Sequence, residues 1–150
     1  MQLTLLDTDH LSELMAGRNR RLLEVARQYY RVHRSFLVSA ISIAEIEAGI
    51  WSSRRDSLVQ AFEAVQPTLE IVPFEAEEAF TSGRIIGHLK INGQPIGPMD
   101  PLIAATAIER DLILATGNTR HYQRIVDAGF ALKLVDWNEE LGDATQTAVS

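Results

Sequence analysis

The fold is decided by the stretch Gly97-Pro98-Met99-Asp100-Pro101-Leu102-Ile103-Ala104-Ala105-Thr106-Ala107, in which a turn places a lone carboxylate at the start of a very apolar helix. Pro101 suits the first position of that helix, because its missing N–H costs nothing there and its φ is already helical. The helix should run to about Arg110 and be central, since it is apolar on most faces. Asp100 is then expected to be the N-cap, and its side chain either accepts N–H groups of the first turn or takes part in chemistry.

Outward from this stretch, short apolar runs alternate with segments in which apolar residues recur at helical spacing. The run Leu112 to Ala115 is continuously apolar, which is typical of a parallel strand buried on both faces. The expected strands are 3–6, 35–39, 69–72, 112–115 and 132–135, and the expected helices begin near residues 11, 22, 42, 54, 75 and 101 and within 116–122. Strands separated by helices throughout predict an α/β sandwich with a mostly parallel sheet.

Length and composition suit one globular domain, with a core of about 3–137 followed by a polar tail, 138–150. The chain is 46% hydrophobic and 23% charged, so neither disorder nor a membrane span is predicted. It has no cysteine, which excludes thiolate catalysis and cysteine-ligated metals and fits a reducing compartment. The apolar run Leu3–Leu6 is too short for a signal peptide, and a cytoplasmic location is therefore expected.

The net charge of −6 arises from 20 acidic and 14 basic residues, so the overall electrostatic field repels nucleic acid. A nucleic-acid ligand would need a local basic patch or a bridging metal. The one basic tract lies around the expected second helix, and its arginines either form a solvated face or contact RNA. They are Arg18, Arg20, Arg21, Arg27, Arg31 and Arg34.

Polar side chains capable of chemistry follow several of the expected strands. Asp7 and Asn118 come just after strands, and Glu45 and Asp100 stand at the starts of helices that follow strands. In parallel sheets ligands gather beyond the carboxyl ends of the strands, so all four side chains are expected at one edge. Clustered carboxylates repel, and a hard divalent ion such as Mg²⁺ or Mn²⁺ removes that cost. The chemistry that follows from such a site is metal-assisted hydrolysis of phosphodiester bonds.

Two of the acidic residues also have purely structural interpretations. Ser42-Ile43-Ala44-Glu45 has the spacing of a capping box, in which the two side chains satisfy each other's backbone N–H groups. Asp9 can equally be the N-cap of the first helix. Because spacing alone does not separate a capping carboxylate from a catalytic one, both interpretations stay open.

Four stretches, taken in order, resemble the four motifs of PIN-domain ribonucleases, and among these the VapC toxins of bacterial toxin–antitoxin pairs. They are Leu5-Leu6-Asp7-Thr8-Asp9, Ser39-Ala40-Ile41-Ser42-Ile43-Ala44-Glu45-Ile46, Pro95-Ile96-Gly97-Pro98-Met99-Asp100-Pro101-Leu102-Ile103-Ala104-Ala105 and Ala115-Thr116-Gly117-Asn118-Thr119-Arg120-His121-Tyr122. The resemblance implies a single PIN-like domain, a three-layer α/β/α sandwich, and an endoribonuclease that requires Mg²⁺ or Mn²⁺. It implies that Asp7, Glu45 and Asp100 are the metal ligands. It also implies a homodimer and inhibition by a small antitoxin protein that inserts a segment into the site.

The last motif departs from the family pattern, which often has a fourth acid where Asn118 stands. Asn118 can still supply a carbonyl ligand or position a water, so we expect it to be catalytic, whereas a second metal ion is in doubt. Asp9 is a candidate to contribute in place of the missing acid. The remaining candidates are Thr116 for a metal-bound water or a phosphate, Arg120 for a substrate phosphate, and His121 and His10 for a phosphate contact, a proton shuttle or ordinary hydrogen bonding.

Two other functions are compatible with parts of the sequence. Asp7-Thr8-Asp9 resembles the Asp-x-Asp of haloacid-dehalogenase-type phosphatases, in which the first acid is the nucleophile. That chemistry also needs a downstream lysine and a late pair of acids, whereas the chain's only lysines are Lys90 and Lys133 and the expected fourth strand leads to Gly117-Asn118. The second possibility is a PIN-like interaction module without catalysis.

The helices around Phe62 and Phe80 are predicted to be amphipathic, with more apolar surface than a small sheet needs. Exposed apolar patches usually mark partner surfaces, and these two helices are therefore expected to form the homodimer contact.

Overall fold

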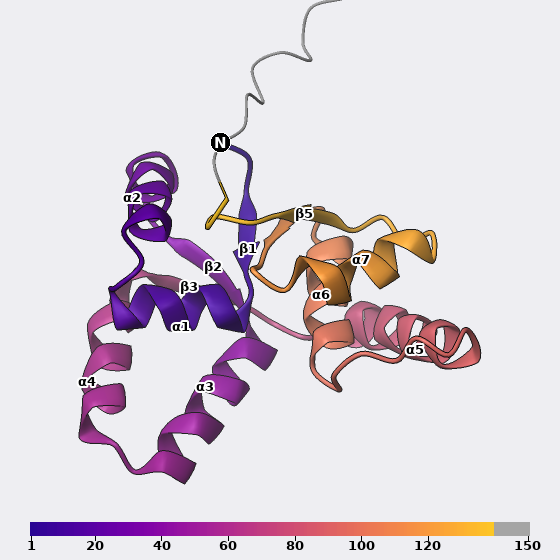
Figure 1. Ribbon diagram of the computed structural model, residues 1–150, viewed down its shortest axis with the longest axis horizontal. Coiled ribbons are helices and arrows are strands. Elements are labelled where there is room, and N and C mark those ends of the chain that lie inside the picture. Colours follow the sequence, from indigo (N-terminus) through magenta and orange to yellow (C-terminus); the bar gives the residue numbers. More distant parts are fainter. Residues whose placement is uncertain (140–150) are drawn as a thin grey trace, which may run out of the picture.

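The computed structural model describes residues 1–139, which form a parallel sheet of five strands covered by helices on both faces (Figure 1). The strands are β1 (Thr4–Leu6), β2 (Phe36–Ser39), β3 (Leu69–Val72), β4 (Ile113–Ala115) and β5 (Lys133–Val135). Their order in the sheet is β3-β2-β1-β4-β5, and every neighbouring pair is parallel. The predicted α/β/α sandwich and its mostly parallel sheet are confirmed, and within the described residues the sheet is parallel throughout.

The helices connect these strands and form the two outer layers. They are α1 (Thr8–Ala16), α2 (Arg20–His33), α3 (Ala40–Ser53), α4 (Asp56–Val65), α5 (Ala76–Ile91), α6 (Asp100–Glu109) and α7 (Thr119–Asp127), with a 3-10 turn, η1 (Gln66–Thr68), before β3. Figure 1 shows α1 to α4 on one side of the sheet and α5 to α7 on the other. The expected helices are all present, with ends that differ by a few residues.

Alternation along the central strand divides the core between the two faces of the sheet. Leu5 packs with α5, α6 and α7, whereas Leu6 packs with α1, α2 and α4. Both leucines are at most 1% exposed, because successive side chains of a strand point to opposite faces. The central helix α6 buries Ile103 and the alanines beside it completely, as its apolar sequence predicts.

Strand order places a topological switch point between β1 and β4. From β1 the chain builds outward through β2 and β3, then returns to the other side of β1 for β4 and β5. In open parallel sheets a crevice forms at the carboxyl ends of the two strands where the direction reverses. Asp7 follows β1 and Thr116 follows β4, so the first and last motifs meet at this crevice.

No helix among residues 1–139 is long and apolar enough to cross a lipid bilayer. Of the predicted polar tail, 138–150, residues 140–150 lie outside the described part of the chain.

Candidate active site

Asp7 lies at the centre of the crevice and is 5% exposed. Its Oδ1 accepts the backbone N–H of Thr8 at 2.8 Å and the Tyr122 hydroxyl at 3.1 Å, and its Oδ2 accepts the Thr116 hydroxyl at 2.8 Å. Burial raises the pKa of Asp7 to about 7, and the negative charge of Asp9 adds to this rise. Asp7 is therefore a well-oriented carboxyl group whose ionised form needs a nearby positive charge.

Asp100 reaches the same crevice from the first turn of α6. Its Oδ1 lies 3.3 Å from the Tyr122 hydroxyl, so one tyrosine joins the two carboxylates. Burial raises the pKa of Asp100, the hydrogen bond from Tyr122 works against this rise, and the charge of Glu45 adds to it. The prediction that Asp100 is the N-cap is wrong: the cap position is Met99, which has no side-chain cap, and Asp100 is the first helical residue. A residue with helical backbone angles is badly placed to cap its own helix, so the carboxylate is available to Tyr122.

Glu45 lies one turn inside α3, on the side that faces α1. Its Oε1 accepts the Thr8 hydroxyl at 2.7 Å, and the same hydroxyl lies 3.0 Å from Ser42 Oγ. The capping-box interpretation of Ser42 and Glu45 is wrong, because β2 runs directly into the helix and Ser39 is the N-cap, accepting the Ser42 N–H at 3.0 Å. Glu45 is thus held by a contact with the start of α1 and not by its own helix.

Asp9 is also bound differently from the cap that its position suggests. The N-cap of α1 is Asp7, and Asp9 accepts the His10 N–H on Oδ1 at 2.6 Å and the Gly117 N–H on Oδ2 at 2.8 Å. A Cβ on Gly117 would lie 3.1 Å from Asp9 Oδ2, so this close approach of the backbone favours glycine. Asp9 is therefore tied to the loop after β4, beside Asp7.

The last motif gives Thr116 and Asn118 different surroundings. Thr116 is completely buried; its hydroxyl donates to Asp7 and accepts the Asn118 N–H at 3.0 Å. The side-chain nitrogen of Asn118 lies 3.0 Å from His121 Nδ1, so within residues 1–139 this amide contacts a histidine and not an acid. Arg120, in the first turn of α7, is exposed.

Two site residues were missed by the sequence analysis, although both lie within its motifs. The sequence analysis assigns no role to Tyr122, yet the hydroxyl of this residue joins Asp7 to Asp100. The available signal was its position three residues before Ile125 on the buried face of α7, where a tyrosine hydroxyl needs a partner. Thr8 was likewise overlooked, and it holds Glu45.

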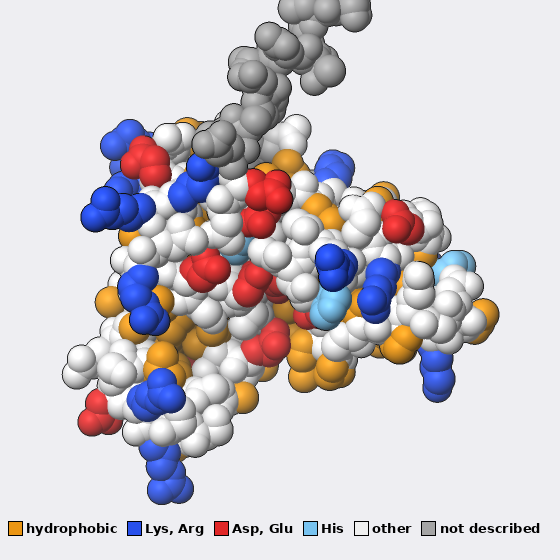
Figure 2. Space-filling model, in the orientation of Figure 1, with side chains coloured by type: hydrophobic (Ala, Val, Ile, Leu, Met, Phe, Trp, Pro, Cys, Tyr) orange, Lys and Arg blue, Asp and Glu red, His pale blue; other side chains and the backbone are white. Residues whose placement is uncertain are grey.

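The surface of the molecule is acidic at the carboxyl edge of the sheet. Figure 2 shows several Asp and Glu side chains in the middle of one face, near the end of β1 and the start of α1, with arginine and lysine side chains farther out. In the described part of the chain no three His, Asp or Glu side chains are gathered so that they would hold a metal ion by themselves. Asp7 and Asp100, which share one hydroxyl, nevertheless fit Mg²⁺, because Mg²⁺ binds through one or two carboxylates and keeps several waters.

The lysine that a phosphatase would need is absent from this crevice. Lys133 begins β5, at the opposite edge of the sheet, where its Nζ lies 2.7 Å from Asp111. Lys90 lies near the C-terminal end of α5 and is exposed. The positions of the chain's two lysines therefore argue against a haloacid-dehalogenase-type site at Asp7 and Asp9.

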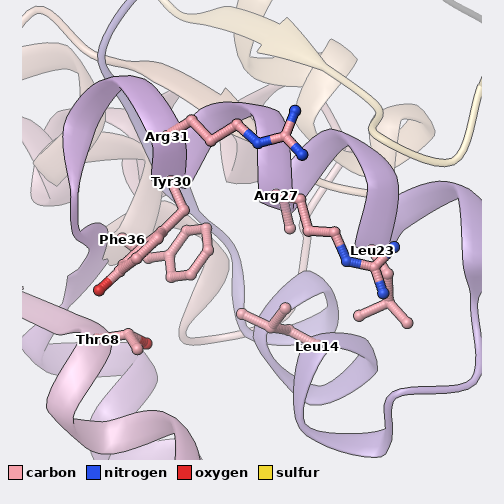
Figure 3. Close-up of a pocket in the computed structure, with 8 residues that line it drawn as sticks. Leu14, Leu23, Arg27, Tyr30, Arg31, Phe36 and Thr68 are labelled. Carbon is pink, nitrogen blue, oxygen red and sulfur yellow. The ribbon is translucent and has the colours of Figure 1, made fainter.

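Apolar grooves lead away from the acidic residues. A groove of about 610 Å³ between α1, α3 and α4 has Thr8 and Glu45 among its lining residues, together with Arg18 and Arg55. A further pocket of about 370 Å³ lies against α2. A smaller depression connects the two: it shares Met15 and Ala61 with the groove, and Leu14 with the pocket. Figure 3 shows the further pocket, with Arg27 and Arg31 along α2 and the rings of Tyr30 and Phe36 close together at one end.

Fold and crevice together define an α/β protein with an acidic site at the carboxyl edge of its sheet, and comparisons with known proteins identify the family to which this fold belongs. The family model described as PIN domain matches residues 4–136, and the chain belongs to this family. It is 28% identical over 102 residues to the "tRNA(fMet)-specific endonuclease VapC" of Shigella flexneri, covering 67% of this chain and 74% of the relative. It is 28% identical over 136 residues to "Ribonuclease VapC1" of Haemophilus influenzae strain R2866, covering 90% of this chain and 98% of the relative.

A similar architecture is found in the solved structure of VapBC-1 from nontypeable Haemophilus influenzae. The TM-score is 0.73 at 25% sequence identity, and the match covers 91% of this chain and 98% of that chain.

Proposed function

We propose that this chain is a metal-dependent endoribonuclease that hydrolyses RNA phosphodiester bonds and acts as the toxin of a VapBC-type toxin–antitoxin pair. The observation that carries the proposal is the Asp7–Tyr122–Asp100 bridge at the switch point of a PIN-family fold. It joins two carboxyl groups whose pKa values are both raised by burial. The whole chain, with its core at about 3–137, is proposed to be a single domain.

Asp7 and Asp100 would hold the ion, which we propose to be Mg²⁺ or Mn²⁺, and we propose that Glu45, whose charge acts on Asp100, approaches the ion as the third carboxylate. When bound, such an ion lowers the pKa of an attacking water and stabilises the charge that develops on the phosphate. Thr116 and Tyr122 orient Asp7, and Thr8 orients Glu45, so the acidic groups are positioned before substrate arrives. Preformed geometry of this kind lowers the reorganisation that the reaction requires.

Asn118 and His121 are proposed to act on the substrate side of the acids. The contact between the Asn118 amide nitrogen and His121 leaves the amide oxygen available to position a water. Burial raises the pKa of Asp100, and a positive charge on His121 opposes this rise, which indicates that the two side chains are near each other. Arg120 is exposed beside His121 and is proposed to bind a substrate phosphate.

The partner protein is proposed to be an antitoxin segment that lies in the apolar grooves and reaches the acidic site. The groove beside Glu45 is continuous, through shared residues, with the pocket against α2. Arginines stand at both, so we propose a segment with apolar side chains toward the grooves and acidic side chains toward Arg18, Arg55, Arg27 and Arg31. While bound, such a segment would block the access of RNA to Glu45.

Expression of the chain in a bacterial host tests this function. We expect growth arrest together with new RNA 5′ ends at a small set of sites, both absent with Asp100→Asn produced at the same level. Equal growth and identical RNA ends for the two proteins would overturn the proposal in favour of a non-catalytic interaction module.

A further inference from the structure

His10 is buried within α1, between the acidic site and the end of β5, and is 0% exposed. Its Nε2 lies 3.1 Å from the backbone nitrogen of Trp137. A backbone N–H can only donate, so Nε2 is the acceptor and the proton of the neutral ring is on Nδ1. Asp136 Oδ1 also lies 3.3 Å from Nε2, and this oxygen accepts the Asn138 N–H at 2.8 Å.

The Nδ1 side of the ring points to the acidic residues. Among the described residues, Nδ1 of His10 is a buried side-chain atom without a hydrogen-bond partner. Its acidic neighbour is Asp9, whose Oδ1 lies 3.6 Å away, just beyond hydrogen-bonding distance. A buried donor that has lost its water is costly unless it is used, so this unpaired N–H requires an explanation.

Asp9 links His10 to the acidic site. Its Oδ2 accepts the Gly117 N–H and lies 3.5 Å from the Thr116 hydroxyl, which itself binds Asp7. A Cβ on Gly117 would approach both Asp9 Oδ2, at 3.1 Å, and His10 Cε1, at 3.7 Å, so these groups are packed against one another. The other oxygen of Asp9, Oδ1, accepts the His10 backbone N–H at 2.6 Å and faces Nδ1 of the His10 ring at 3.6 Å, so both contacts of this oxygen come from His10.

We propose that His10 is a positioning residue of the acidic site: the Trp137 backbone fixes its tautomer, and its Nδ1–H, which faces Asp9 Oδ1 at 3.6 Å, attracts that carboxylate and keeps it beside Asp7 and Thr116. The end of β5 is thereby connected to the cation site through one imidazole ring. This inference rests on the proposed function only in taking the acidic cluster to be a site for a divalent cation. Removing a residue that orients a metal ligand, or orients a neighbour of that ligand, typically weakens metal binding by about 10–100-fold.

Two substitutions of His10 separate the two ring nitrogens. Asn places an N–H at the position of Nδ1 but has no atom at Nε2, whereas Gln reaches the Nε2 position and leaves Nδ1 without a counterpart. Mn²⁺ affinity, measured from the electron paramagnetic resonance signal of the free ion, should fall about tenfold or more with His10→Gln and within about threefold with His10→Asn. In an Asp9→Asn background, His10→Gln should have no further effect, because the two residues act through one contact.

Nitrogen-15 NMR of the imidazole ring gives a measurement that does not depend on metal. The wild-type protein should show the Nδ1–H tautomer, and Asp9→Asn should shift that signal while the melting temperature stays within a few degrees. If both His10 variants bind Mn²⁺ as the wild type does and differ from it only in melting temperature, His10 is a core residue and the inference is overturned. An Nε2–H tautomer would overturn it as well. A wild-type protein that binds no Mn²⁺ would count against the proposed function, and the NMR measurement would then decide the His10 contact by itself.

Discussion

The hydroxyl group of Tyr122 lies 3.1 Å from Asp7 Oδ1, although the two residues are 115 positions apart in the chain. The same oxygen lies 3.3 Å from Asp100 Oδ1. A hydroxyl has only one proton to donate, so it cannot satisfy both carboxylates at once. The tyrosine therefore sets the spacing of the two acids but leaves their charge uncompensated, which is the condition that a divalent cation relieves.

Tyr122→Phe removes this shared hydroxyl and leaves the ring in place. At pH 8 without metal, the free energy of unfolding should fall by about 1.5–3 kcal/mol, the usual contribution of a hydrogen bond to a charged group. Chemical denaturation in the presence of a chelator measures the change. Tyr30→Phe is the matched control, because Tyr30 is half-buried in the pocket of Figure 3 and makes a ring contact with Phe36. Equal stability of the two variants would show that the Tyr122 bridge contributes nothing.

The raised pKa of Asp7 predicts how the stability of the metal-free protein depends on pH. The folded-state pKa of about 7 exceeds the ordinary value of 3.8, so the folded protein holds this proton more tightly than the unfolded chain. The contribution of Asp7 to the free energy of unfolding should therefore be greatest below pH 4. It should fall by up to about 4 kcal/mol as the pH rises from about 4 to 7. The dependence should flatten in Asp7→Asn. Thermal melts between pH 5 and 8 that show the same slope for both proteins would contradict this.

Arg120 is predicted to bind a phosphate of the RNA. Because each neutralised phosphate releases counterions, Arg120→Ala should weaken RNA binding and reduce the salt slope by about 0.7. Mn²⁺ affinity should not change. Arg54→Asn is the control, since Arg54 lies at the far end of α3 from the sheet, with a left-handed φ of 51° that asparagine tolerates (Figure 1). If the Arg120→Ala salt slope equals that of the wild type, the substrate path runs over the arginines of α2 instead.

A homodimer remains a prediction, and the structure changes the surface on which it rests. Phe62 is 6% exposed and belongs to the core, so it offers no contact surface, whereas Phe80 on α5 is 67% exposed. Phe80→Ser should shift a sedimentation-velocity profile from dimer toward monomer at tens of micromolar, an order of magnitude set by ordinary interface affinities. Val32→Ser, which changes another exposed apolar residue, should leave the profile as in the wild type. A wild-type protein that sediments as a monomer would refute the dimer.

The strands and the edge that carries the site could be predicted because both depend on local patterns. Apolar runs such as Leu112 to Ala115 identify buried strands, and parallel strands place the groups that follow them at one edge. The helix caps could not be predicted, because the choice among Asp7, Asp9 and Ser39 depends on where each strand stops hydrogen bonding. A local spacing rule does not contain that information.

The partners of the acids could not be predicted for a different reason. Thr8 meets Glu45 across 37 positions, and Tyr122 meets Asp7 across 115. Neither pair leaves a periodic trace in the sequence, since each depends on how two helices are placed against the crevice. For Asn118 the place in the motif could be predicted from the sequence, but the contact of its side chain with His121 could not.

Cleavage of a labelled RNA by the purified protein tests the central claim most directly. Cleavage should require Mg²⁺ or Mn²⁺, stop with a chelator, and fall at least about a hundredfold with Asp100→Asn or Glu45→Gln, as expected when the groups that bind the ion and order the attack are lost. Glu47→Gln, two residues further along α3, should cleave like the wild type. Cleavage that continues in the chelator, or that Glu45→Gln retains at the level of Glu47→Gln, would contradict the assignment of the acidic crevice as a metal-dependent ribonuclease site.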